Sequence, residues 1–272
     1  MKHILSVDLE EWFCVANFEK AIPRESWAAR ESRIEAQTRA LLDLFDRRQA
    51  RATFFILGWV GERHPDLLKD IVARGHELAS HGYAHDLVHR LTPEAFREDL
   101  ARGLGVVRDI TGLSCRGYRA PSFSLRRSDT WAWEALAEAG IGYDSSVFPV
   151  MHDRYGEPDA PRAPFDVPAG GRMIREFPLS TVRVAGRNLP VAGGGYLRLY
   201  PLGVTRWAIR RIEAEGLSAV VYLHPWEIDP EQPIPPAHWL RVWRHRVGMK
   251  SLLHRLDVLL DAFEFVPFRD MA

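Results

Sequence analysis

The segment Ala79-Ser80-His81-Gly82-Tyr83-Ala84-His85 holds two histidines four residues apart, just after a short apolar piece ending in Gly75-His76-Glu77-Leu78. If such a segment is helical, its two imidazoles share one face and can bind a single metal ion. The spacing alone is weak evidence, because two polar residues on a solvated turn give the same pattern. The rest of the chain favours a metal site, because further ionisable residues follow other strand-like segments.

Short apolar runs and amphipathic stretches alternate on both sides of this segment. The runs with strand character lie at 3–7, 52–57, 218–224 and 265–268. The stretches with helical periodicity lie at 32–47, 65–75, 92–107, 128–140 and 252–263. This alternation predicts an α/β fold built on a parallel barrel or sheet.

Residues 148–201 interrupt the alternation. They are rich in proline and glycine, with β-like pieces near 174–179 and 181–184. We predict that they form an insertion or cap on one catalytic domain that spans residues 1–272. The run Gly193-Gly194-Gly195 lacks the lysine and the strand-to-helix setting of a phosphate-binding loop.

The composition is that of an ordinary globular protein, with 272 residues, 46% hydrophobic and 26% charged. Lys plus Arg and Asp plus Glu both number 36, so the net charge does not indicate a nucleic acid or an anionic membrane as partner. Cys14 and Cys115 are predicted to be buried thiols. Asp8 interrupts the N-terminus before a signal-peptide core, and no run approaches the ~18 apolar residues of a membrane span. These features predict a cytoplasmic protein without a transmembrane segment.

Ionisable residues follow several of the predicted strands. They are Asp8, Glu10 and Glu11 after the first strand, then His81 and His85, Arg119, Asp144 and His224. In parallel α/β barrels, catalytic residues gather where strands end and loops begin. The sequence therefore predicts that these side chains meet in one site.

Two imidazoles and one carboxylate form a three-ligand metal site that leaves a position open for water. We expect His81, His85 and Glu10 to be these ligands, with Asp8 as the general base. His224 can donate a proton to a leaving nitrogen, and Arg119 can hold the base ionised. Such a ligand set suits Zn²⁺, with cobalt, nickel and iron as alternatives.

These motifs resemble those of the polysaccharide deacetylase family, the carbohydrate esterases with a NodB homology domain, over most of the chain. His81-Gly82-Tyr83-Ala84-His85 is similar to the metal-binding motif H-[ST]-x-x-H, with Gly82 in place of serine or threonine. Arg119-Ala120-Pro121-Ser122 is similar to R-x-P-[YF], and Leu223-His224 to the late motif whose histidine acts as the acid. The resemblance implies a distorted (β/α) barrel of the NodB type.

Three further phrases resemble one branch of this family, the deacetylases encoded with exopolysaccharide and exosortase systems. They are Asp8-Leu9-Glu10-Glu11-Trp12-Phe13, Asp144-Ser145-Ser146-Val147-Phe148-Pro149 and His152-Asp153-Arg154-Tyr155-Gly156. Members of this branch usually lack a signal peptide. The resemblance implies a role in exopolysaccharide biosynthesis.

The chain departs from the family pattern at two positions. The first family motif has adjacent aspartates, whereas Leu9 follows Asp8 here, so the ligand role passes to Glu10 or, as an alternative, to Glu11. Ser122 stands where the family has an aromatic residue, and its backbone amide is a candidate oxyanion donor.

Other residues beside the motifs are candidates for binding substrate. Asp144 could pair with His224 or contact the substrate, and the indoles of Trp12 and Trp226 could stack on sugar rings.

The predicted function is metal-dependent removal of N-acetyl groups from an N-acetylated polysaccharide or its lipid-linked precursor. One alternative is hydrolysis of a small cyclic amide or imide on the same fold. Another is a non-catalytic glycan-binding relative, which the irregular first motif supports. The predicted partner is an N-acetylated glycan.

Overall fold

The computed structural model describes residues 1–15, 18–19, 21–152, 155–191, 193–236 and 238–272. Its described strands are β1 (Lys2–Leu9), β2 (Thr53–Ile56), β3 (Glu77–Ser80), β4 (Gly117–Tyr118), β5 (Tyr143–Asp144), β6 (Phe165–Ala169), β7 (Arg172–Glu176), β8 (Thr181–Val184), β9 (Arg187–Pro190), β10 (Val220–Leu223) and β11 (Glu264–Val266). The main sheet has the order β10-β1-β2-β3-β4-β5-β7-β6, and β11 also pairs with β1.

The main sheet is parallel except for β6, which runs antiparallel to β7. Its central strand β1 is buried along its whole length after Lys2. Strands covered on both faces are expected to be continuously apolar, as Ile4-Leu5-Ser6-Val7 nearly is. The predicted parallel α/β arrangement is confirmed.

The helices are α1 (Ile34–Arg47), α2 (Gly58–Arg63), α3 (Pro65–Ala73), α4 (Pro93–Thr111), α5 (Thr130–Glu138), α6 (Gly194–Leu199), α7 (Leu202–Ala214), α8 (Trp239–Arg246) and α9 (Met249–Ala262). Helix α4 begins as its sequence indicates, since the Thr92 hydroxyl accepts a hydrogen bond from the Ala95 amide (3.2 Å) and Pro93 is the first helical residue. It ends at Gly112, which has a φ of 72°.

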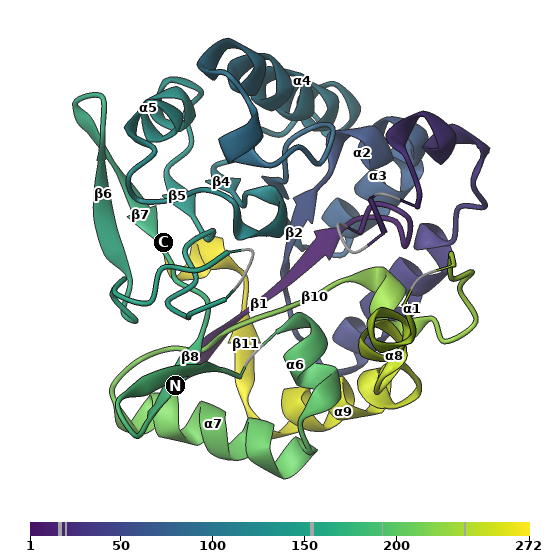
Figure 1. The fold of residues 1–272 in the computed structure, drawn as a ribbon, viewed down its shortest axis with the longest axis vertical. Helices are drawn as coiled ribbons and strands as arrows, with labels where there is room; N and C mark the ends of the chain where they lie inside the picture. The colour runs from purple at the N-terminus through teal and green to yellow at the C-terminus, as the bar shows by residue number, and fades with distance from the viewer. Residues whose placement is uncertain (16–17, 20, 153–154, 192, 237) are drawn as a thin grey trace.

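The sheet curls into a half barrel around the centre of the molecule (Figure 1). In this view α4 and α5 lie at the top, α7 and α9 at the bottom, and the β6–β7 pair forms the left edge. The curl confirms the predicted distorted barrel. It leaves the carboxyl ends of the parallel strands on one side of the molecule.

Part of the predicted cap at 148–201 belongs to the main sheet. β7 pairs in parallel with β5, with Asp144 opposite Glu176, and β6 then extends the sheet. β8 and β9 form a separate hairpin. The pairing could not be foreseen, because β5 is only two residues long. The assignment of residues 1–272 to one catalytic domain stays a prediction.

Cys14 and Cys115 are both buried and unpaired, as predicted. In the described part of the chain, no helix is both long enough and apolar enough to span a bilayer.

Candidate active site

The carboxyl ends of β1, β3, β4 and β10 bring the predicted catalytic and metal-binding residues together. Asp8 lies in β1, His81 follows β3, Arg119 follows β4 and His224 follows β10. Glu10 follows β1 by one residue. These segments are far apart in the sequence, so the parallel sheet itself assembles the site.

Glu10, His81 and His85 form a compact group in which one ligand atom of each residue lies within 4.8 Å of the others. His81 Nε2 is 3.7 Å from Glu10 Oε1, and His85 Nε2 is 3.3 Å from Glu10 Oε2. Ligands bound tetrahedrally to zinc at ~2.0–2.2 Å are themselves separated by roughly 3.4 Å. The three side chains therefore fit a divalent cation.

The hydrogen bonding of His81 also fits a metal ligand. Its Nδ1 donates to the carbonyl oxygen of Arg119 (2.7 Å), which places the lone pair on Nε2. This Nε2 is buried and has no hydrogen-bond partner among the described residues. An unpartnered buried nitrogen is costly in an apoprotein, and a ligated ion would satisfy it.

The histidine pair lies on an irregular loop, so the helical setting considered for it is wrong. Gly82 and His85 have φ angles of 72° and 59°, which turn the backbone sharply. Asp99 holds the loop by accepting hydrogen bonds from the amides of Tyr83 (2.8 Å) and Ala84 (2.9 Å). The two imidazoles still converge, because the turn brings their ring centroids within 5.5 Å.

The same loop explains why glycine replaces serine or threonine at position 82. A Cβ on Gly82 would lie 2.6 Å from Asp99 Oδ2, and the φ of 72° also disfavours a side chain. The Asp99 carboxylate occupies the space that a hydroxyl-bearing side chain would need.

Glu10, rather than Glu11, faces the two histidines. Glu11 accepts hydrogen bonds from the Ser32 hydroxyl and from the amides of Arg33 and Ile34, so it caps the start of α1. Burial alone would raise the pKa of Glu10, but His85 and His224 together hold that pKa well below its usual value. Glu10 is thus an ionised carboxylate in the cluster.

Arg119 fixes Asp8 from inside the protein. Its guanidinium is fully buried and donates to Asp8 Oδ1 (2.7 Å), to the Ser6 hydroxyl (2.9 Å) and twice to Ser145. Its Cζ also lies 4.1 Å from the centre of the Phe55 ring. The Arg119 guanidinium therefore holds Oδ1 of Asp8, while Oδ2 faces the site.

His224 closes the other side of the site. Its Nε2 is 3.2 Å from Glu10 Oε1 and 3.8 Å from Asp8 Oδ2, so it faces both carboxylates. Its Nδ1 lies 3.0 Å from Glu227 Oε2 and donates to it, and Arg198 binds the other oxygen of Glu227 (2.7 Å). Burial lowers the pKa of His224, but Glu10 and Glu227 outweigh it and raise the pKa to about 10. A metal cation bound to Glu10 would offset the part of this pKa increase that is due to Glu10.

Glu227 and Arg198 were not anticipated as site residues. Burial would raise the pKa of Glu227, but Arg198 and His224 lower it to about 2. Glu227 also accepts from the His224 amide (2.9 Å), so it is the N3 residue of a capping box whose N-cap is His224. That spacing, His224-Pro225-Trp226-Glu227, is a signal in the sequence, whereas the contribution of Arg198 from α6 is not.

The predicted sugar-stacking tryptophans are packed inside the protein. Trp12 is buried, and its indole nitrogen donates to the Glu31 carbonyl (3.0 Å). Trp226 is also buried and stacks against two imidazoles, with centroid distances of 5.0 Å to His224 and 4.7 Å to His245. Neither indole presents an open face to a sugar ring, because each lies against the core.

Pairing with His224 was one of the two roles expected for Asp144, and the structure does not show that pairing. It is fully buried and accepts hydrogen bonds from the amide (2.8 Å) and hydroxyl (2.9 Å) of Ser146. Burial raises its pKa to about 6 and raises the pKa of the adjacent Glu176 further. Two adjacent buried carboxyl groups are most stable when they share one proton, because two negative charges would repel each other. Sharing a proton allows this pair to lie inside the sheet.

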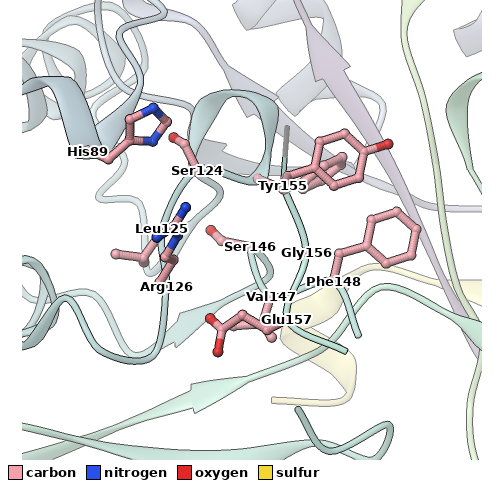
Figure 2. Close-up of a pocket in the computed structure, with 11 residues that line it drawn as sticks. His89, Ser124, Leu125, Arg126, Ser146, Val147, Phe148, Tyr155, Gly156 and Glu157 are labelled. Atoms are coloured by element: carbon pink, nitrogen blue, oxygen red, sulfur yellow. The ribbon is translucent and has the colours of Figure 1, made fainter. Parts of the chain in front are cut away.

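A small pocket, with room for about 10 Å³ and partly open to solvent, lies next to the Arg119 turn. Figure 2 shows the lining side chains, which come from Ser124–Arg126, Ser146–Phe148 and Tyr155–Glu157, together with His89. Phe123 also lines it, and its ring lies 5.0 Å from that of Tyr222, which is 5.8 Å from His224.

The two other sequence features near this pocket have different outcomes. Ser122 lies in the turn with a φ of 52°, and its role as an oxyanion donor stays a prediction. Of the phrase at 152–156, Asp153 and Arg154 lie outside the described residues, whereas Tyr155 and Gly156 line the pocket.

Two family models match adjacent parts of the chain. Polysaccharide deacetylase matches residues 29–143, and a domain of unknown function, DUF3473, matches residues 145–272. A peptidoglycan deacetylase from Helicobacter pylori is 31% identical over 115 residues, which are 42% of this chain and 37% of that protein. The chain thus matches about a third of the length of the curated relatives.

Solved structures share the fold over the whole chain. A candidate polysaccharide deacetylase from Mycobacterium smegmatis has a TM-score of 0.65 at 18% identity, covering 100% of this chain and 90% of that one. A CE4 family pseudoenzyme from Bacillus anthracis has a TM-score of 0.54 at 14% identity, covering 99% and 65%. The fold is therefore shared with a protein described as a pseudoenzyme. The matched model shows that the chain carries a polysaccharide deacetylase domain at residues 29–143, and the solved structures show that the whole chain shares the fold.

Proposed function

We propose that this protein is a metal-dependent hydrolase that removes N-acetyl groups from an N-acetylated glycan. The observation that carries the proposal is the assembly of Glu10, His81 and His85 beside the Asp8–Arg119 pair and His224. A glycan-binding relative without catalysis has no need for an oriented carboxylate and a second imidazole that face the same space. These groups are those that amide hydrolysis requires.

Glu10, His81 and His85 would hold the ion, and zinc is the ion that we propose for two imidazoles and one carboxylate. A bound divalent cation would polarise the acetamide carbonyl and lower the pKa of water. Asp8, oriented by Arg119, accepts the proton of the attacking water. His224 protonates the leaving nitrogen through Nε2, while Glu227 holds its Nδ1. The backbone amide of Ser122 is the donor that we propose for the developing oxyanion.

An N-acetylated polysaccharide or its lipid-linked precursor is the substrate class that we propose. The support is the match of residues 29–143 to the polysaccharide deacetylase model and the likeness to a peptidoglycan deacetylase. The DUF3473 match is consistent with the exopolysaccharide-associated branch that the motifs resemble.

Removal of the metal is expected to abolish acetate release from chitooligosaccharides, and added zinc to restore it. The measurement is acetate produced by protein treated with chelator and then dialysed, with and without zinc. Full activity in metal-free protein would contradict the proposal. Cyclic imides in the same assay test the alternative substrate class, and saturable glycan binding without any product would indicate a non-catalytic relative.

Neutralising Glu227 is expected to lower the proton affinity of His224, because its carboxylate accepts from Nδ1 at 3.0 Å. A general acid works only while protonated, so in Glu227→Gln the basic limb of the kcat/KM profile moves to lower pH, by about 1 unit or more. Glutamine keeps an acceptor for the His224 amide, which limits structural change. Asp229→Asn is the matched control, since Asp229 pairs with Arg33. An unmoved basic limb in Glu227→Gln would contradict this role.

A further inference from the structure

Helix α8 exposes two tryptophans and a leucine that lie close together in the sequence. Trp239 is 67% exposed, Trp243 51% and Leu240 44%. At about 100° per residue, these three side chains share one side of the helix. These side chains are not exposed because the helix is poorly held, since the opposite side of α8 packs against the protein.

The anchor is formed by His245 and the backbone that follows it. His245 is buried, stacks on Trp226 at 4.7 Å, and lies 3.2 Å from the Gln232 side chain. Arg198 donates to the carbonyl oxygens of His245 (2.7 Å) and Val247 (2.8 Å). Since Arg198 also binds Glu227, the exposed side of α8 is held in a fixed position relative to the active site.

The charge around α8 is one-sided, although the whole chain is neutral. Residues 232–256 contain five Lys or Arg and no Asp or Glu. Arg255 is tied to backbone carbonyl groups, whereas Arg241, Arg244, Arg246 and Lys250 form no ion pair with any described residue. On the helical projection Arg246 flanks the apolar side on one edge, and Arg244 and Arg241 flank it on the other.

We infer that the exposed surface of α8 docks onto an anionic lipid surface. Tryptophan prefers the boundary between headgroups and acyl chains, and flanking arginines reach the anionic headgroups. A neutral sugar polymer would gain nothing from four unpaired cations, and a second copy of α8 would repel the first. The anchored helix would place the active site close to the membrane, where a lipid-linked glycan is within reach.

The test is co-sedimentation of the full chain with vesicles of phosphatidylcholine alone or of an equimolar mixture with phosphatidylglycerol. We expect binding to the mixed vesicles, weakened by salt, and about tenfold or more weaker binding for Trp239→Ser/Trp243→Ser. Trp207→Ser is the matched control, because Trp207 is also 51% exposed but lies on α7. Circular dichroism and acetate release from soluble chitooligosaccharides should be unchanged in both variants.

Three outcomes would overturn the inference. The first is equal binding of wild type and the double variant to mixed vesicles, or an equal loss in Trp207→Ser. The second is loss of chitooligosaccharide binding in the double variant without any vesicle binding by the wild type, which would make α8 a glycan platform. The third is a concentration-dependent dimer that the double variant abolishes. The lipid test does not need turnover, so it can fail or succeed independently of the deacetylase proposal.

Discussion

Replacing His81 with alanine is expected to abolish stoichiometric zinc binding and reduce acetate release to background. The variant removes the buried Nε2 that no described residue satisfies and leaves only two of the three proposed ligands. Loss of a residue that merely supports a ligand weakens metal binding by ~10–100-fold, so loss of a ligand should cost more. Metal content by elemental analysis and zinc affinity by calorimetric titration measure the effect.

A second variant separates metal loss from misfolding. His81→Ala also leaves the buried Arg119 carbonyl without its donor, at a cost of about 1–3 kcal/mol in the free energy of unfolding. His85 contacts Glu10 but makes no such structural bond with a described residue, so His85→Ala should lose zinc with a smaller loss of stability. His254→Ala removes an exposed imidazole on α9 and should keep both zinc and activity. Full zinc occupancy in His81→Ala and His85→Ala would refute the metal site.

The core of this site could be predicted because parallel sheets gather their strand ends. Asp8 and His224 follow or end apolar runs and His81 follows a short apolar piece, and that pattern is local in the sequence, whereas Arg119 is predicted from its motif Arg119-Ala120-Pro121. No long-range information was needed beyond the expectation that the runs are parallel neighbours. The choice of Glu10 over Glu11 needed the structure, because only the fold shows that Glu11 caps α1.

The features that could not be predicted depend on contacts between distant segments. The sequence shows that Trp226 adjoins His224, but not that His245, from α8, stacks on the same indole. It shows Glu227, but not that Arg198 reaches it from α6. In the same way, the neutral total charge hides the cationic surface of α8, because charges elsewhere balance it.

The residues of the candidate site are distributed over the two matched segments and the residues that precede them. The polysaccharide deacetylase model covers His81, His85 and Arg119, whereas His224, Glu227 and Arg198 lie in the DUF3473 segment. Asp8 and Glu10 precede both. To bring these residues into one site, β1 must pair with β10. The two strands do pair, with Ile4 opposite Val220 at one end and Val7 opposite Leu223 at the other. The proposed chemistry therefore depends on residues outside the polysaccharide deacetylase match.

Replacing Asp8 with asparagine is expected to leave zinc bound and to lower kcat by about 10²–10⁴-fold, which is the usual contribution of a general base. Asparagine can still accept from Arg119, but it cannot take a proton from water. Glu10→Gln is the informative partner variant, since it should lose zinc, whereas Asp8→Asn should keep it. Near-normal turnover in Asp8→Asn would assign the base to another carboxylate.

The same variant should also be less stable, and this gives the assignment a second readout. Arg119 is fully buried, and Asp8 is the carboxylate that its guanidinium contacts, so neutralising Asp8 leaves a buried cation without its counterion. Removing one partner of such a pair costs about 3–5 kcal/mol. Because a base on a mobile or exposed carboxylate would cause no such loss, a large drop in kcat together with a lower Tm and full zinc occupancy would identify Asp8 as the base that Arg119 orients. Pairing this variant with Arg119→Met, which removes the buried cation as well, should regain part of the stability but none of the turnover.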